Sequence, residues 1–305
     1  MGRRAIRGAR ILITGASQGI GRCLAVEAAK RGALVLAAAR SAELLNELAR
    51  EVRLCDGRIV TLSADVTSAR DRRAMVEAAR KHFGGLDVLV NNAGIGATGH
   101  FAEASPERLR KIMEVNFFGL TETTRAFLPL LKQGRQPAIV NVSSIAGKRA
   151  IPARSEYSAS KFAVQGFSQA LRAELAKDGI EVLVISPGLT QTNFSKNMLE
   201  QKAKMAIDHM RGMSAEDVAR ATLRAIERGR NDIVLTFKAK LIALVNRFLP
   251  RLADRIARKK VIALFEDEIA RRRQEKMDRA AKAATAPAGA ARPSDQHPRI
   301  PAPLR

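Results

Sequence analysis

Residues 9–21, which read ARILITGASQGIG, place a short apolar run directly before a glycine-rich turn. The run Ala9–Thr14 has the length and aliphatic composition of a buried strand, and a segment of helical period begins at Ile20. Glycines in such a turn bend the backbone tightly and let it approach a ligand closely. The helix that follows presents free N–H groups and a partial positive charge, so this stretch predicts a site for phosphate groups.

The alternation of strand and helix continues along most of the chain. Seven apolar runs are predicted to be buried strands: Ala9–Thr14, Ala33–Ala39, Arg58–Ser63, Asp87–Asn91, Ala138–Ser143, Glu181–Ser186 and Asp232–Leu235. Longer amphipathic segments are predicted to be helices, among them Ile20–Arg31, Ala42–Arg53, Ser68–Phe83 and Ser105–Lys132. Strands that alternate with helices form a parallel sheet, so the sequence predicts an α/β protein with helices on both faces of a doubly wound sheet.

The end of the second predicted strand indicates which dinucleotide such a fold would bind. An NAD-binding protein places an acidic residue there, which binds the ribose 2′-hydroxyl. Here residues 37–41 read AAARS, and Arg40 stands beside the place of the missing carboxylate. A guanidinium can bind a 2′-phosphate through two hydrogen bonds, so NADP(H) is predicted in preference to NAD(H), which stays the second choice. The alternative interpretation is a surface arginine at the start of a helix.

Two more turns follow predicted strands and are candidate ligand contacts. Asp65 and Val66 follow the third strand, where the carboxylate can bind an adenine or, equally well, cap the next helix. Residues 91–94, NNAG, follow the fourth strand, and their small size leaves room for a ligand. Because the ligand crevice of an open α/β sheet lies at the carboxyl ends of its strands, we expect both turns to border it.

Tyr157, the single tyrosine of the chain, and Lys161 lie four residues apart, which places them on one face of a helix. We expect the nearby ammonium group to lower the pKa of the tyrosine, so that the phenol exchanges a proton near neutral pH. Ser144 follows the fifth predicted strand, where its hydroxyl can orient a substrate carbonyl. A Tyr–Lys pair alone occurs by chance on solvated helices, but together with Ser144 and the glycine-rich turn it predicts a catalytic site.

These motifs in this order, TGASQGIG, NNAG, VNFFG, NVSSIAG and YSASK, resemble the single-domain branch of the short-chain dehydrogenase/reductase family over roughly residues 8–236. The order is most similar to that of hydroxysteroid-dehydrogenase-like and bacterial members. The resemblance implies a Rossmann fold and a catalytic set of Asn116, Ser144, Tyr157 and Lys161. It also implies a homodimer or homotetramer that associates through the helices in 105–132 and 157–177.

The predicted cofactor site combines these turns with positions that the resemblance implies. By that resemblance Lys161 contacts the nicotinamide ribose, Asn116 holds a water in a proton relay, and Thr192 contacts the nicotinamide carboxamide. The residues predicted to bind the cofactor are Gly15, Ser17, Gln18, Gly19, Ile20, Gly21, Arg40, Ser41, Asp65, Val66, Asn92, Ala93, Gly94, Asn116, Tyr157, Lys161, Pro187, Gly188 and Thr192.

The site predicts hydride transfer between a nicotinamide and a small-molecule carbonyl or secondary alcohol, with Tyr157 passing the proton and Ser144 holding the oxygen. NADP(H) favours the direction of carbonyl reduction. A non-catalytic NADP-binding regulator or scaffold on the same fold is the alternative, although such a protein has no need of the catalytic residues. An epimerase or dehydratase also uses a Tyr–Lys pair, but with a different glycine spacing in the loop. The sequence does not indicate which molecule is reduced.

Composition limits the other partners. The 305 residues include 53 lysines and arginines against 30 acidic residues, a formal net charge of +23, which favours anionic partners. The basic residues are scattered and lack interleaved aromatic residues, which argues against nucleic acid. Cys23 and Cys55 make no disulfide framework, and no signal segment or membrane span is recognisable, so a cytoplasmic location is expected. The four histidines lack metal-ligand spacing, so no metal site is predicted.

Three parts are expected along the chain: a catalytic domain over 1–237, a basic helical extension over 238–279 and a disordered Ala/Pro-rich tail over 280–305. Within the first, 193–213 is predicted to be a mobile lid, and its apolar members suggest an apolar substrate: Phe194, Met198, Leu199 and Met205. In the extension, Lys238–Lys260 combines apolar residues with regularly spaced arginines and is interrupted by Pro250. It is expected to lie on an anionic membrane surface or to dock on the domain or a second copy.

Overall fold

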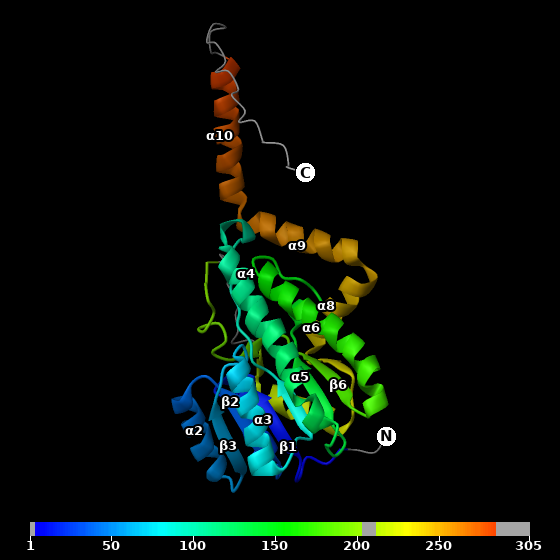
Figure 1. Ribbon diagram of the computed structural model, residues 1–305. Helices are drawn as coiled ribbons and strands as arrows, with labels where there is room; N and C mark the ends of the chain where they lie inside the picture. Colours follow the sequence, from blue (N-terminus) through cyan, green and yellow to red (C-terminus); the bar gives the residue numbers. More distant parts are fainter. Residues whose placement is uncertain (1–3, 203–211, 285–305) are drawn as a thin grey trace, which may run out of the picture. The chain divides into compact units, whose positions relative to one another are not determined.

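The computed structural model describes residues 4–202 and 212–284. A parallel sheet of seven strands lies at its centre, in the order β3-β2-β1-β4-β5-β6-β9 (Figure 1). The strands are β1 (Arg10–Thr14), β2 (Leu34–Ala39), β3 (Arg58–Ser63), β4 (Val88–Asn91), β5 (Ala138–Val142), β6 (Glu181–Ser186) and β9 (Asp232–Val234). Each lies within one residue of its predicted bounds, and the predicted Rossmann-type α/β fold is confirmed.

Helices cover both faces of the sheet, because successive residues of a strand point to opposite faces. On one face α1 (Gly19–Lys30), α2 (Ala42–Arg53) and α7 (Ala215–Glu227) pack against Ile11 and Ile13. On the other face, turned toward the viewer in Figure 1, α3 (Ala69–Phe83), α5 (Gly119–Leu131) and α6 (Ser155–Glu174) pack against Leu12. Strand β1 is therefore buried on both faces, which holds the turn at its end in place.

The strand order reverses between β1 and β4, which are neighbours in the sheet. From β1 the chain proceeds outward to β2 and β3, and from β4 it proceeds the other way to β5, β6 and β9. Connections leave such a pair in opposite directions, so a crevice opens beyond the carboxyl ends of the two strands. The glycine-rich turn after β1 and the NNAG turn that includes the end of β4 both lie at this point.

The long helix predicted for Ser105–Lys132 is observed as three successive segments. They are α4 (Pro106–Met113), a wider π-helical turn over Glu114–Phe118 and α5. The wider turn directs the amide of Asn116 toward the main chain of Ile95 and the hydroxyl of Ser160, with which it forms hydrogen bonds. This interruption was not predicted from the sequence, because π turns are rare and occur mostly as single turns inside α-helices.

The compact unit that contains the sheet ends at Ala257 rather than at the predicted boundary after residue 237. It includes α8 (Phe237–Phe248) and the first part of α9 (Pro250–Leu264), with the predicted break at Pro250 between them. Ala239 of α8 is buried, and Asn246 Nδ2 donates to the Lys148 carbonyl at 2.9 Å. These contacts explain the shift of the boundary, because one side of α8 packs on the domain.

The second compact unit begins at Arg258, and its helix α10 spans Glu266–Ala284. The helix thus continues beyond residue 280, where the disordered tail was predicted to begin. The reason is the composition of residues 280–284, AAKAA, because alanine and lysine favour helices. The rest of the predicted tail, 285–305, lies outside the described residues. No helix in the described part of the chain is long and apolar enough to cross a membrane.

Candidate active site

A cavity of about 590 Å³ lies beyond the carboxyl ends of the strands, and its volume is typical of ligand sites. Most of the residues predicted from the sequence line it: Gly15, Ser17, Gln18, Gly19, Ile20, Arg40, Ser41, Asp65, Val66, Asn92, Ala93, Gly94, Ser144, Tyr157, Lys161, Pro187, Gly188 and Thr192. Gly21 and Asn116 are the exceptions and lie behind the wall. The tertiary structure thus brings together turns that are up to 177 residues apart, from Gly15 to Thr192.

The glycine-rich turn is closely packed against the turn after β4. Gly15 has a φ of +65°, and a Cβ added to it would lie 2.8 Å from the Ala93 Cα atom. A Cβ on Gly21 would lie 2.4 Å from the Gly15 carbonyl oxygen. Asn92 Nδ2 joins the two turns by donating to the carbonyls of Thr14 (3.0 Å) and Gly15 (3.1 Å). Gly21 therefore acts by letting the first turn of α1 approach Gly15, and it does not itself border the cavity.

The start of α1 fits the diphosphate of a dinucleotide. Its N-cap residue, Gln18, accepts no side-chain hydrogen bond from the first helical turn. The Gln18 amide oxygen instead accepts a hydrogen bond of 2.8 Å from Asn197 Nδ2. The backbone N–H groups at the helix start, which border the cavity, are thus free of a side-chain cap and can bind an anion.

The far end of the cavity, beside β2 and β3, holds the residues predicted to bind the adenosine half. Arg40 is exposed at the rim, and no described residue forms an ion pair or side-chain hydrogen bond with its guanidinium. The Ser41 hydroxyl accepts from Leu44 N at 3.3 Å and caps α2. Asp65 Oδ1 accepts hydrogen bonds from the N–H and the hydroxyl of Thr67, so this carboxylate stabilises its own turn.

Tyr157 and Lys161 lie together on α6 at the other end of the cavity, where Ser144 follows β5. The Lys161 Nζ atom lies 5.7 Å from the centre of the Tyr157 ring and donates to the Val142 carbonyl at 2.9 Å. Burial lowers the pKa of Lys161 to about 8, because the charged ammonium is removed from water. The predicted grouping of a phenol, an ammonium and a hydroxyl is therefore present.

The prediction that Lys161 lowers the pKa of Tyr157 is wrong for this structure. Burial raises the pKa of Tyr157, and only a hydrogen bond with Ser144 and the positive charge of Arg154 act in the opposite direction. Burial favours the neutral form of both groups, so the ammonium is itself weakened as a source of positive charge. The sequence spacing shows that the two groups are close, but it does not show how far they are removed from water.

Asn116 lies behind Gly94 and is fully buried. Its Oδ1 atom accepts from Ile95 N at 2.8 Å, and its Nδ2 atom donates to the Ile95 carbonyl and to Ser160 Oγ, each at 2.9 Å. In this arrangement the amide supports the main chain that follows the NNAG turn. Its participation in a proton relay stays a prediction.

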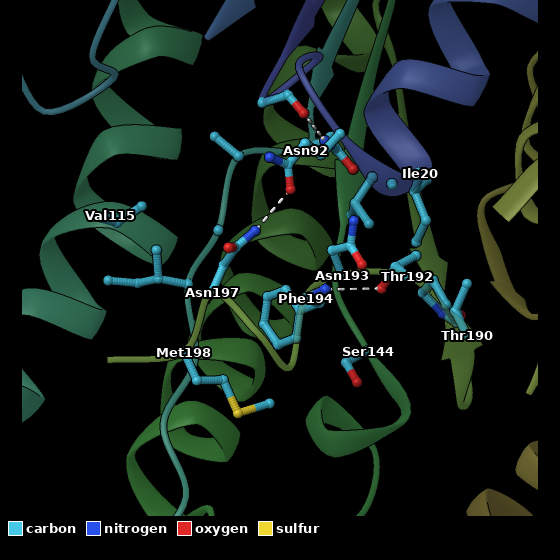
Figure 2. A pocket seen from close by; sticks show the side chains of 18 of the residues that line it. Ile20, Asn92, Val115, Ser144, Thr190, Thr192, Asn193, Phe194, Asn197 and Met198 are labelled. Carbon is cyan, nitrogen blue, oxygen red and sulfur yellow. Dashed lines mark hydrogen bonds between the residues drawn. The ribbon is translucent and has the colours of Figure 1, made fainter. Parts of the chain in front are cut away.

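The described part of the predicted lid, residues 193–202, borders the cavity on the substrate side. Figure 2 shows the side chain of Phe194 between Asn92 and Ser144, with those of Asn197 and Met198 to its left in this view. The ring centre of Phe194 is 5.7 Å from that of Tyr157. Two of the four apolar lid residues, Phe194 and Met198, thus line the cavity. Leu199 is 44% exposed and lies outside it, and Met205 is outside the described residues.

A buried ion-pair network, which sequence reasoning missed, holds this segment beside the helix of Tyr157. Arg108 of α4 donates to both carboxylate oxygens of Glu156, at 3.1 and 2.6 Å. A third donor, Nη1, binds Glu200 at 2.8 Å. Because Glu156 precedes Tyr157 and Glu200 belongs to the segment 193–202, Arg108 connects the two. Nothing in a single sequence indicates that these three charges, from distant positions, meet.

Sequence reasoning also missed Arg154, which lines the cavity near Tyr157 together with Ile145, Ile151 and Leu189. Arg154 is one of 53 lysines and arginines, and its position three residues before the tyrosine carries no recognisable signal. The substrate side of the cavity therefore consists mainly of apolar side chains and one arginine.

The comparisons with known proteins agree with this geometry. The family model for short chain dehydrogenase matches residues 9–203. The Dehydrogenase/reductase SDR family member 7B of Bos taurus is 37% identical over 254 residues, which cover 80% of this chain and 78% of that protein.

Two solved structures share the fold. A short-chain dehydrogenase/reductase from Burkholderia phymatum in complex with NAD is 25% identical, has a TM-score of 0.75, and the match covers 82% of this chain and 96% of that one. A short-chain dehydrogenase from Burkholderia cenocepacia in complex with NADP is 29% identical, with a TM-score of 0.71 and coverage of 83% and 99%. This chain belongs to the short-chain dehydrogenase/reductase family and is an oxidoreductase that binds a nicotinamide cofactor.

Proposed function

We propose that the protein is an NADP(H)-dependent reductase of a carbonyl compound whose carbon chain is apolar, with Tyr157 as the acid that protonates the carbonyl oxygen. The observation that carries this proposal is that one cavity holds a group of candidate catalytic side chains at one end and an exposed arginine at the other. Ser144, Tyr157 and Lys161 meet at one end, and Arg40, whose guanidinium has no partner among the described residues, stands at the other. The non-catalytic regulator is the weaker alternative, because binding alone does not require the buried phenol and ammonium.

The residues of the chain would act in the following way. When bound, the nicotinamide supplies the hydride. Ser144 binds the carbonyl oxygen, and Tyr157 donates its proton to that oxygen as the alcohol forms. Burial keeps Tyr157 protonated at neutral pH, which suits a proton donor. Phe194 and Met198 exclude water from the reacting carbon.

The substitution Tyr157→Phe tests the proposal because it removes only the phenolic oxygen. Turnover of a carbonyl panel, followed by the loss of NADPH absorbance, should fall by roughly 100- to 10,000-fold. Binding of NADPH, measured by its fluorescence, should persist in the variant as a control for folding. Undiminished turnover would overturn the role of Tyr157, and tight NADPH binding by wild type without turnover of any carbonyl would favour the regulator.

The preference for NADP(H) is supported by Arg40, whose exposed guanidinium has no partner among the described residues. No acidic side chain replaces it at the end of β2, where residues 37–41 read AAARS. A ribose 2′-phosphate would supply the missing anionic partner.

We also propose that α8 and the start of α9 lie on an anionic membrane surface. One side of α8 packs on the domain, but eight large apolar residues of 237–256 remain exposed: Phe237, Leu241, Ile242, Leu244, Phe248, Leu249, Leu252 and Ile256. Exposed basic residues stand among them, at positions 238, 240, 247, 251 and 255, with Asp254 as the one acidic residue of this stretch. Apolar side chains flanked by basic ones fit the boundary of an anionic bilayer.

Flotation with lipid vesicles tests the membrane proposal. Wild type should float with vesicles that contain phosphatidylglycerol and less with pure phosphatidylcholine, and Phe248→Ser with Leu252→Ser should reduce flotation. The matched control is Leu54→Ser, which removes an 87% exposed leucine from the end of α2. Equal flotation of all three proteins, or none, would end this proposal. A stable oligomer lost only in the double variant would instead assign the surface to a second copy.

Association into a dimer or tetramer through the helices in 105–132 and 157–177 also stays a proposal. It is supported by Phe118, next to α5, and Phe162 of α6, two large aromatic side chains that are exposed on these segments. Sedimentation of wild type and of Phe162→Ser tests it, because the variant should dissociate at a lower concentration range. An unchanged distribution would contradict it.

A further inference from the structure

Arg154 carries a positive charge that no residue in the described part of the chain neutralises. Arg154 is 8% exposed and lines the cavity, and its Nε atom has no hydrogen-bond partner among the described residues. No described residue forms an ion pair with it. The nearest acidic residue in the sequence, Glu156, uses both carboxylate oxygens to bind Arg108. A buried charge without a partner is costly, so its presence in a stable fold requires an explanation.

The main chain holds Arg154 firmly at this position. Ala153 adopts a φ of +58°, which is unfavourable for a residue other than glycine, and its carbonyl accepts from Gly99 N at 3.0 Å. Arg154 N donates to the Ile151 carbonyl at 3.1 Å, and the Arg154 carbonyl accepts from Ser158 N at 2.8 Å. The backbone is therefore fixed on both sides of the arginine, and the side chain starts from a rigid turn.

The described residues around Arg154 supply no counter-charge. The side chains that line the substrate side are mainly apolar: Ile145, Ile151, Leu189, Phe194 and Met198. Among the lining residues the one carboxylate is Asp65, which belongs to the opposite, adenosine end. The titratable group that Arg154 influences is instead the phenol of Tyr157, whose pKa it acts to lower. The arginine thus stands beside the reacting position, among groups that cannot neutralise it.

We propose that Arg154 binds an anionic oxygen group of the substrate, a carboxylate or a phosphate, and so makes anionic carbonyl compounds the preferred substrates. This inference rests on the proposed reductase function. The planar guanidinium offers paired N–H donors that match both groups, and their binding would give the buried charge a partner that the described residues do not provide. The apolar lining would hold the remaining carbon atoms of the same molecule.

The test compares matched anionic and neutral substrates at saturating NADPH. The pairs are acetoacetate and levulinate against their methyl esters, and hydroxyacetone phosphate against hydroxyacetone. For wild type, kcat/KM should favour the anionic member of at least one pair, and the pair with the largest ratio identifies carboxylate or phosphate. In Arg154→Met that ratio should fall by roughly 10- to 100-fold, as expected for loss of a charge-assisted hydrogen bond. Arg154→Lys should restore part of it.

The ratio is used because loss of Arg154 also acts on Tyr157 and changes both absolute rates. The matched control is Arg149→Met, in the same segment of the chain. Its guanidinium lies outside the cavity and binds Asn246 and Asp254, so the variant should keep the wild-type ratio. A wild-type preference for the neutral member of every pair, or an unchanged ratio in Arg154→Met, would overturn the inference while the reductase function stands.

A second readout separates this inference from the proposed function. Thermal unfolding of NADPH-saturated protein should shift upward with levulinate or inorganic phosphate in wild type, and less in Arg154→Met. Such a shift without turnover of any carbonyl would support anion binding and contradict the reductase. Equal shifts in both proteins would count against Arg154 as the binding group.

Discussion

The two walls of the cavity are held by different kinds of interaction. On the cofactor side the contacts are made by the main chain, where Gly15 and Gly21 leave no room for a methyl group. Around Tyr157 they are made by side chains, through the network of Arg108 and the ring of Phe194. The shape of a wall made by the main chain changes only if the backbone conformation changes, whereas a few substitutions change the shape of a wall made by side chains. The first wall therefore fits the cofactor, and we expect substrate choice to depend on the second, beside Tyr157.

The largest effect is expected when the side-chain wall loses its central charge. Arg108→Gln leaves Glu156 buried without its ion-pair partner, and the free energy of unfolding should fall by about 3–5 kcal/mol. The control Glu200→Gln removes only the more exposed arm of the network and should cost about 1 kcal/mol or less. Urea unfolding of the three proteins measures both. Equal losses would show that this wall does not depend on the buried pair.

Lys161 lies where the two walls meet, and its stability effect depends on pH. Its pKa of about 8 in the folded protein lies below the ordinary 10.5, so folding carries a penalty of about 3 kcal/mol below pH 8. Between pH 8 and 10.5 the folded protein releases its proton first, and the penalty disappears. The unfolding free energy of wild type minus that of Lys161→Met should therefore rise by about 3 kcal/mol over this range.

The Lys161 experiment is best made in a Tyr157→Phe background, so that the phenol does not titrate. Urea unfolding at several pH values gives the difference directly. A difference that is independent of pH would show that the ammonium is not desolvated in the folded protein.

The main-chain wall is tested by Gly21→Ala, whose methyl group would meet the Gly15 carbonyl and the Asn92 amide. We expect a loss of stability of about 1–3 kcal/mol and weaker NADPH binding, because the turn must move. Gly166→Ala on α6 is the matched control, since nothing lies within 4 Å of its added Cβ. That variant should gain about 0.5–1 kcal/mol from the better helix propensity of alanine. Unfolding curves measure the stability of the variants, and titration with NADPH measures their cofactor binding. If Gly21→Ala changes neither, the main-chain wall tolerates an added methyl group and does not differ from the side-chain wall in this respect.

The smallest effect concerns Arg40 at the rim of the main-chain wall. Arg40→Ala should lower the ratio of kcat/KM for NADPH over NADH by about 10-fold, a modest change because the guanidinium is exposed. Steady-state kinetics with both cofactors on one substrate measure the ratio. If the ratio does not change, the cofactor preference is decided elsewhere.

Most of the fold and the main-chain wall could be predicted from the sequence. The strands were found within one residue because buried parallel strands are continuous apolar runs bounded by turns. The glycine-rich turn, the NNAG turn and the set of Ser144, Tyr157 and Lys161 were found because their chemistry depends on local spacing. The bend at Pro250 was found for the same reason, since proline acts on its own turn of helix.

The side-chain wall could not be predicted. The ion pairs of Arg108 join residues as far apart as 92 positions, and no local pattern marks their partners. Arg154 is buried and has no partner among the described residues, which a sequence does not show. The direction of the Tyr157 pKa was wrongly expected because desolvation depends on everything that surrounds the phenol.

The sequence by itself determined the α/β fold, the reaction class and the residues that lie close together within a single turn or helix. Strand length, glycine geometry and helical spacing determine these features, and all three are local properties. Only the tertiary structure decided which charges are neutralised and which buried arginine of the cavity has no partner among the described residues, because burial and ion pairing arise from segments that meet after folding. That arginine, Arg154, is the side chain from which we infer the substrate.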